Sequence, residues 1–106
     1  MSHTEETAFS IISLAGDGRA ALTKAMKSAR KGDFGQAEEL VHEAEEHLLK
    51  AHQLQTEELL KKEADGSLKD PFNVLIAHAQ DYVMTGMLMK EMTSEIINLY
   101  TQLRAK

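Results

Sequence analysis

The chain has 106 residues, of which 42% are hydrophobic, and a formal net charge of −5 at pH 7. We therefore expect one small domain over residues 1–106. The acidic balance argues against nucleic-acid binding, which depends on neutralising phosphates with Lys and Arg. Because there is no apolar run near the roughly 20 residues of a membrane span, no visible signal peptide and no cysteine, we expect a cytoplasmic protein.

The composition favours helices, since Ala, Leu, Glu, Lys, Gln and Met dominate and there is one proline. The first break in the helical pattern lies at Gly32, which can take the left-handed conformation that ends a helix. Asp33 follows as a helix N-cap, with Gln36 three residues later. This spacing predicts a capping box at the start of a second helix.

The second break runs from residue 64 to residue 71. Gly66 predicts the end of a helix, and Asp70 predicts the N-cap of the next one, with Pro71 at its first position. The predicted helices cover residues 4–31, 34–64 and 71–104. Short connections between long helices predict an all-α fold, an antiparallel up-down-up three-helix bundle.

In the first predicted helix, the stem of Arg19 belongs to the apolar stripe that we expect to be buried. Gly16 and Gly18 weaken this helix, so we expect a neighbouring helix to approach closely there. The third predicted helix has two apolar seams, which is more than two other helices can cover. One contains Leu75, Ala79, Tyr82, Gly86, Met89, Thr93, Ile96, Tyr100 and Leu103; the other contains Val74, Ala77, Asp81, Met84, Leu88, Met92, Glu95 and Leu99. We therefore expect self-association through the third helix.

Most candidate sites for chemistry lack a necessary partner. Glu39 and His42 have the spacing of a di-iron bundle, but such a site needs a second copy of the motif on another helix. His42, His47 and His52 are five residues apart, so their side chains do not converge on one helix face. The chain has no Gly-rich phosphate loop and no cysteine nucleophile.

His78 remains as the candidate nucleophile. A neutral imidazole keeps a free lone pair that can accept a phosphoryl group, and the resulting phosphoramidate stays reactive. That chemistry suits a phosphoryl relay. The side-chain amide of Gln80 is a candidate contact for the phosphate, on the same helix or on a neighbouring one.

Four stretches carry a resemblance to a known family: Ile11–Gly16, Lys31–Phe34, Ala51–Thr56, and His78–Asp81 followed by Met84-Thr85. On these stretches the chain resembles the enzyme IIA component of the lactose/cellobiose (lactose/chitobiose) sugar phosphotransferase system. The resemblance implies that His78 accepts phosphate from the carrier HPr and passes it to a cysteine on the cognate IIB protein. The transported sugar would be a β-disaccharide such as lactose or cellobiose.

The resemblance also implies a homotrimer in which three copies of Asp81 meet at the axis around a divalent cation. Carboxylate and water ligands suit Mg²⁺, which we expect to be the ion. The chain departs from the family at Tyr82, where the family commonly has a second histidine; a tyrosine offers a hydroxyl there instead.

Two other functions remain possible for a helical protein of this kind. A histidine phosphotransfer protein of a two-component relay would be a four-helix bundle with Lys-Gly soon after the histidine, and this chain has neither feature. A trimeric helical interaction module without chemistry would need no reactive histidine. Labelling with HPr, enzyme I and phosphoenolpyruvate separates the three functions.

Overall fold

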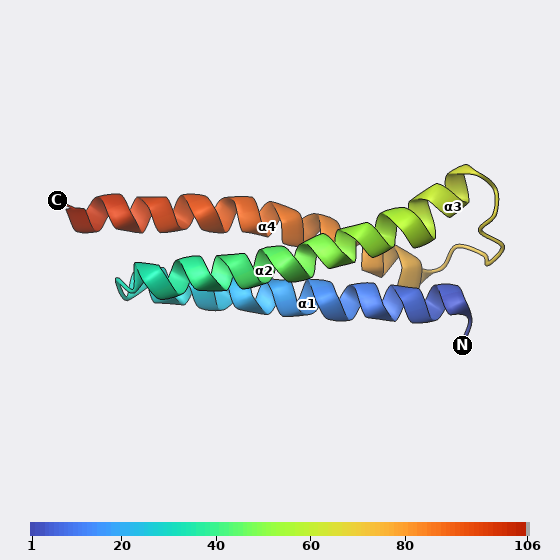
Figure 1. The fold of residues 1–106 in the computed structure, drawn as a ribbon, viewed down its shortest axis with the longest axis horizontal. Coiled ribbons are helices and arrows are strands. Elements are labelled where there is room, and N and C mark those ends of the chain that lie inside the picture. The colour runs from blue at the N-terminus through green and yellow to red at the C-terminus, as the bar shows by residue number, and fades with distance from the viewer. Residues whose placement is uncertain (106) are drawn as a thin grey trace.

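The computed structural model describes residues 1–105, and its regular elements are all helical, which confirms the predicted all-α class. In chain order the elements are α1 (His3–Arg30), α2 (Phe34–Leu54), the π-helical segment η1 (Gln55–Leu60), α3 (Lys61–Ala64) and α4 (Val74–Ala105). The chain passes three times along a body of 57 × 22 × 19 Å, and each pass reverses the direction of the one before (Figure 1). Within residues 1–105, every helix is too short or too polar to span a lipid bilayer.

The two glycines predicted to end helices have left-handed backbones, with φ of +87° at Gly32 and +81° at Gly66. The carboxylate of Asp33 accepts a hydrogen bond of 3.1 Å from the amide of Gln36, so Asp33 caps α2 as predicted. The amide of Asp33, however, donates to the carbonyl oxygen of Ser28 at 2.9 Å. This bond replaces the reciprocal half of the predicted capping box and joins the end of α1 to the start of α2.

The prediction that the last helix begins at Pro71 is wrong, because α4 begins at Val74. Its cap is Asn73 and not Asp70. The side-chain oxygen of Asn73 accepts a 3.0 Å hydrogen bond from the amide of Ile76. Asparagine is as good an N-cap as aspartate. Pro71 lies in the irregular connection before α4, where its lack of a backbone N–H costs no hydrogen bond.

The predicted second helix over residues 34–64 is one continuous rod, formed by α2, η1 and α3 (Figure 1). At η1 the backbone hydrogen bonds span five residues instead of the four of an α-helix. The amide of Lys61, for example, donates to the carbonyl oxygen of Thr56. Propensity and periodicity do not predict such a π-helical segment, since the residues on both sides of it favour the ordinary α-helix.

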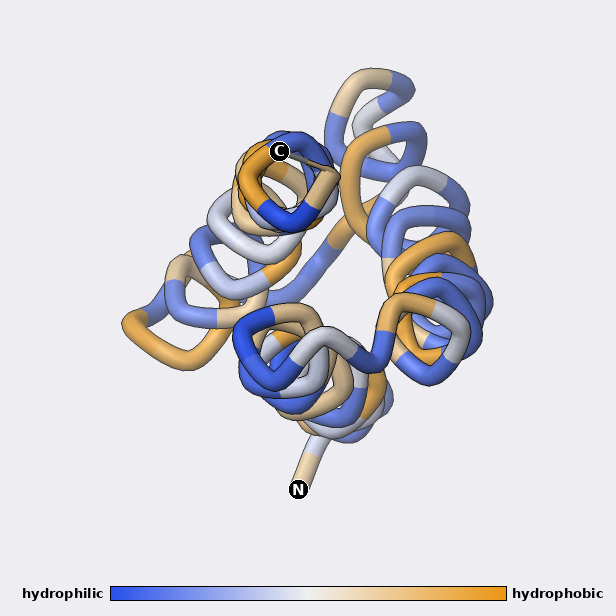
Figure 2. The backbone as a smooth tube through the Cα atoms, turned by 90° about the vertical axis from the view of Figure 1, so that its left-hand side faces the viewer, coloured by the Kyte–Doolittle hydropathy of each residue, from blue (hydrophilic) through white to orange (hydrophobic). Residues whose placement is uncertain are grey.

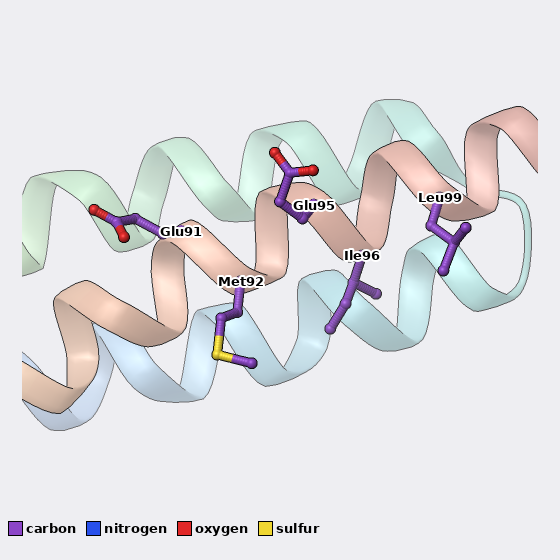
Figure 3. Close-up of a pocket in the computed structure, with 5 residues that line it drawn as sticks. All are labelled: Glu91, Met92, Glu95, Ile96 and Leu99. Carbon is purple, nitrogen blue, oxygen red and sulfur yellow. The ribbon is translucent and has the colours of Figure 1, made fainter.

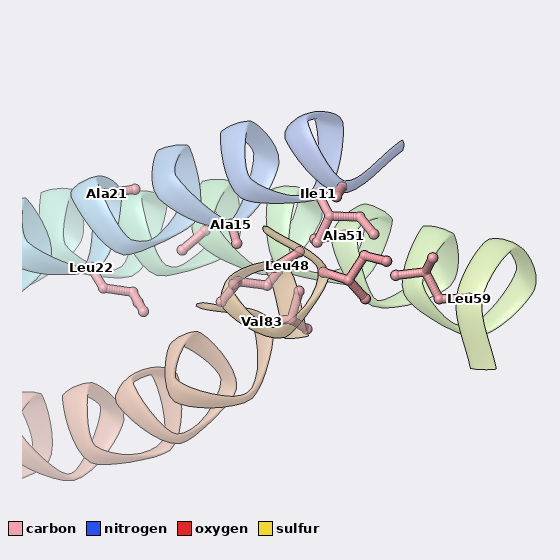
Figure 4. Packing of buried hydrophobic residues seen from close by; sticks show 12 residues of the cluster. Ile11, Ala15, Ala21, Leu22, Leu48, Ala51, Leu59 and Val83 are labelled. Carbon is pink, nitrogen blue, oxygen red and sulfur yellow. The ribbon is translucent and has the colours of Figure 1, made fainter. Parts of the chain in front are cut away.

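The core lies between the three passes and is built largely of small side chains packed around Leu48 of α2 (Figure 4). A Cβ atom added at Gly18 would lie 2.9 Å from Leu48 Cγ, and one added at Gly86 would lie 2.7 Å from Leu48 Cδ2. The helices α1 and α4 therefore both approach the same leucine. The close approach predicted at Gly18 is therefore confirmed, whereas a Cβ added at Gly16 would lie 3.4 Å from the ring of Tyr82, which is an ordinary contact distance.

One face of α4 is turned away from the other two passes. We call Asp81, Met84, Leu88, Met92 and Leu99 the outer seam; all five are exposed. In the view along the long axis, apolar stretches of the α4 backbone lie on its outer side as well as toward the centre (Figure 2). In this single chain, the second predicted seam of α4 is therefore largely uncovered.

The C-terminal half of the outer seam is bordered by acidic residues. Met92, Ile96 and Leu99 point to one side of α4, and Glu91 and Glu95 point away from them (Figure 3). These five residues line a shallow apolar groove along the helix. An exposed apolar strip with a polar border is typical of a protein–protein contact surface.

Candidate functional site

His78 lies in the second turn of α4, five residues after the Asn73 cap, and is exposed. The cap fixes where α4 begins, and the helix then fixes the direction in which His78 leaves the backbone. An exposed imidazole on a rigid helix is accessible to another protein without any opening of the fold. This is the position that a protein-to-protein phosphoryl carrier requires.

The imidazole of His78 is stacked on the phenol ring of Tyr82, one helical turn further along α4. The ring centroids are 5.2 Å apart and the ring planes differ by 29°. Residues four apart are neighbours on a helix surface, so α4 itself brings the two rings together. Tyr82 is half-buried and packs against the hydrophobic core, so its ring is held more firmly than that of His78.

Arg19 of α1 reaches the same ring. Its Cζ atom lies 4.5 Å from the centroid of the Tyr82 ring, within the range of a cation–π contact. One guanidinium nitrogen, Nη1, donates a 2.6 Å hydrogen bond to the hydroxyl of Thr85. The Thr85 hydroxyl in turn donates to the backbone carbonyl oxygen of Asp81 at 2.7 Å. The guanidinium is therefore held between an aromatic face and a hydroxyl on two successive turns of α4.

The other two predicted site residues are arranged differently. Asp81 follows His78 by three residues, so it lies next to His78 on the helix surface, and its side chain is exposed. Gln80 is half-buried and only two residues from His78, a spacing that puts side chains on different sides of a helix. Within one chain, α4 therefore brings Asp81 to His78 but directs Gln80 elsewhere; a phosphate contact by Gln80 stays a prediction.

Three of the remaining histidines lie near glutamates. His42 Nδ1 is 3.8 Å from Glu45 on α2, and His47 Nε2 is 3.9 Å from Glu43 on the same helix. His3 Nε2 of α1 is 3.5 Å from Glu58 of η1. In residues 1–105 no three His, Asp or Glu side chains of one chain gather in a way that could hold a metal ion. A metal at Asp81 would need ligands from other copies.

Sequence reasoning missed the part that Arg19 plays at the site. It placed Arg19 in the core by its aliphatic stem, and the stem does pass Gly86, where an added Cβ would lie 3.5 Å from Arg19 Cγ. The guanidinium at the end of that stem contacts Tyr82 and Thr85. The spacing of His78 and Tyr82 could have predicted their contact, whereas the contact with Arg19 depends on how α1 and α4 are aligned.

The chain was compared with known proteins and with solved structures. The family described as "PTS system, Lactose/Cellobiose specific IIA subunit" matches residues 6–101. The lichenan-specific phosphotransferase enzyme IIA component of Bacillus subtilis (strain 168) is 40% identical over 99 residues, which cover 93% of this chain and 88% of that relative.

Solved structures give the same result. The cellobiose-specific enzyme IIA of Bacillus anthracis matches with a TM-score of 0.94 and 37% identity, over 100% of this chain and 95% of that one. The IIA(chitobiose) of Escherichia coli, solved in complex with HPr, matches with a TM-score of 0.81 and 30% identity, over 98% of this chain and 99% of that one.

The chain belongs to the lactose/cellobiose-specific IIA family of the phosphotransferase system, as the residues around His78 predicted. It is a phosphotransferase component, a phosphoryl carrier that works in sugar uptake.

Proposed function

We propose that His78 is the residue that carries the phosphoryl group, which it receives from HPr and passes to a cysteine of the cognate IIB protein in the cytoplasm. The observation that carries this proposal is the exposed imidazole of His78, stacked on a tyrosine in the second turn of α4. The complex of IIA(chitobiose) with HPr supports the same donor for this chain. The family description supports a β-disaccharide such as lactose or cellobiose as the transported sugar.

The transfer from HPr to His78 and the transfer from His78 to the IIB cysteine are both in-line displacements at phosphorus. In the first, the lone pair of an imidazole nitrogen of His78 forms an N–P bond while the bond between phosphorus and the donor group of HPr breaks. In the second, the thiolate of the IIB cysteine attacks the phosphorus, and the electron pair of the N–P bond returns to the imidazole. Such reactions need placement and charge stabilisation more than additional reactive groups.

We further propose that the up-down-up bundle is the subunit of a homotrimer that forms through the outer seam. Met84, Leu88, Met92 and Leu99 of this seam are between 56% and 61% exposed in the single chain. Burying apolar surface contributes roughly 25 cal/mol per Å², so covering this strip with its own copies would be favourable. Light scattering on the purified protein tests the assembly.

In such a trimer Asp81 lies on the same face as these apolar side chains and would meet its two copies. Uncompensated burial of three carboxylates would cost on the order of several kcal/mol per ion. Hard oxygen ligands of this kind suit Mg²⁺, which would offset the charge when bound and hold the three subunits together at this level. Asp81 fits this role by residue type and by its place in the outer seam.

Phosphorylation by enzyme I, HPr and phosphoenolpyruvate, followed by intact mass, tests the role of His78. Wild type should gain one acid-labile, alkali-stable phosphoryl group. His78→Ala should gain none, with an unchanged helical spectrum, because one exposed mid-helix residue contributes little to helix stability. His52→Ala, which replaces a half-buried histidine on α2, is the matched control and should be labelled like wild type. Full labelling of His78→Ala, or loss of labelling in His52→Ala, would contradict the proposal.

A further inference from the structure

The side chains of His78, Tyr82 and Arg19 form a connected stack that links the proposed phosphoacceptor to a second helix. The imidazole lies against the phenol ring at 5.2 Å, and the guanidinium lies 4.5 Å from the centroid of the same ring. His78 is exposed, whereas Tyr82 and Arg19 are half-buried. The stack thus runs from the surface of α4 to the interface between α4 and α1.

We propose that Tyr82 is a positioning residue for phosphoryl transfer, and that Arg19 holds Tyr82 in place. This inference rests on the proposed role of His78. The ring of Tyr82 would restrict the imidazole to one orientation, with its nitrogen presented outward to the incoming phosphorus. The guanidinium of Arg19 would act through Tyr82, without itself touching the reacting atoms.

Three sets of contacts keep the Tyr82 ring where it can do this. The ring lies beside Gly16 of α1, where an added Cβ atom would be at an ordinary contact distance of 3.4 Å from Tyr82 Cε2. Arg19 covers the ring and is itself anchored by its 2.6 Å hydrogen bond to Thr85. The Thr85 hydroxyl is anchored to the Asp81 carbonyl oxygen. The ring is therefore fixed by α1 and α4 together, whereas an exposed imidazole alone would sample several rotamers.

Fixing the orientation of a reacting group speeds transfer, because the misaligned rotamers no longer have to be excluded at the moment of reaction. Aromatic pairs on a protein surface have modest interaction energies, which correspond to roughly a two- to tenfold change in the population of the stacked orientation. We therefore expect the loss of the Tyr82 ring to slow transfer from phosphorylated HPr by roughly two- to tenfold.

The experiment compares wild type, Tyr82→Leu, Tyr82→Phe, Arg19→Met and the double variant Tyr82→Leu/Arg19→Met. Two measurements are made on each: the rate of transfer from phosphorylated HPr at saturating acceptor, and the NMR shift of the His78 ring protons in the unphosphorylated protein. Tyr100→Leu removes the other tyrosine of α4, and Lys24→Met removes an exposed charge of α1. Both are matched controls and should leave rate and shift unchanged.

We expect Tyr82→Leu to lower the rate and to move the His78 ring protons downfield, because the ring current of the stacked phenol is lost. Tyr82→Phe should retain most of the rate and of the shift, since the stack needs the ring and not the hydroxyl. Arg19→Met should lower the rate less than Tyr82→Leu does, and should have no further effect in the double variant.

Three results would overturn the inference: wild-type rate in Tyr82→Leu, an equal loss in Tyr82→Phe, or additive losses in the double variant. The last of these would mean that Arg19 acts on the phosphoryl group independently of Tyr82. If Tyr82→Leu does not fold, Arg19→Met decides: its His78 shift must move toward that of an unstacked imidazole. Failure of the proposed function would look different, since His78→Ala would then still be labelled.

Discussion

The two faces of α4 are both apolar, yet they differ completely in exposure. On the inner face Val83 and Thr93 are 0% exposed and Ile97 is 7% exposed, whereas on the outer face Met84 is 61% and Leu99 is 58% exposed. A helix that is apolar on most of its circumference is normally covered on most of it. The inner face is covered by α1 and α2 of the same chain. The outer face is left uncovered by its own chain, and it is the face through which the proposed trimer would form.

The substitution with the largest expected effect on this contrast is at Asp81, the charged residue among the five that define the outer seam. In wild type, chelator at alkaline pH should dissociate the proposed trimer, because burying three charged carboxylates without a cation costs on the order of several kcal/mol per ion. Asp81→Leu should remain trimeric in chelator, since leucine removes the repulsion and extends the apolar seam. Light scattering with and without chelator measures both.

Asp17→Leu is the control for this comparison, because Asp17 is exposed on α1 and lies outside the outer seam. It should dissociate in chelator as wild type does. A wild type that is monomeric under all conditions, or an Asp81→Leu variant that no longer forms trimers, would contradict the axial role of Asp81.

The second largest effect is expected from alanine substitutions at two nearby residues of α4, one on the inner face and one on the outer face. Ile97→Ala opens a cavity in the chain's own core and should lower the free energy of unfolding by about 3 kcal/mol at every protein concentration. Leu99→Ala leaves that core intact, so its effect should grow with protein concentration, because only the assembled form loses contacts. Urea unfolding at two concentrations measures the difference. Equal, concentration-independent losses in both variants would show that Leu99 belongs to the core of the single chain.

Much of the fold could be predicted from the sequence because local rules decide it. The Gly32 turn, the Asp33 cap and the buried stripes follow from backbone conformation, capping chemistry and helical periodicity. The start of α4 could not, because Asp70 and Asn73 are both good caps and the choice between them depends on how the connection packs. These rules also do not predict the π-helical hydrogen bonds of η1.

At the site, the local part was predictable and the long-range part was not. Tyr82 contacts His78 because the two residues are one helical turn apart. Arg19 precedes Tyr82 by more than 60 positions in the sequence and contacts its ring only because α1 is aligned with α4. Such an alignment is fixed by close approaches such as Gly18 and Gly86 around Leu48, which depend on all three helices at once.

The smallest effect expected concerns Thr93, the polar residue buried deepest on the inner face of α4. Its side chain is 0% exposed, and among residues 1–105 its hydroxyl oxygen has no hydrogen-bond partner. A buried polar group without a partner costs roughly 1–3 kcal/mol. Thr93→Val has nearly the same shape and should therefore raise the free energy of unfolding by about 1 kcal/mol, or roughly 4 °C in Tm. Thermal unfolding of the two proteins measures this gain.

The matched control is Thr101→Val on the same helix, where the hydroxyl donates a 2.8 Å hydrogen bond to the carbonyl oxygen of Ile97. Because Thr101 is exposed, its loss should change stability by no more than about 0.5 kcal/mol. A Thr93→Val variant less stable than wild type would mean that the Thr93 hydroxyl has a partner in solution, such as an internal water. In that case the inner face of α4 would contain a polar contact, and the contrast with the outer face would rest on exposure alone.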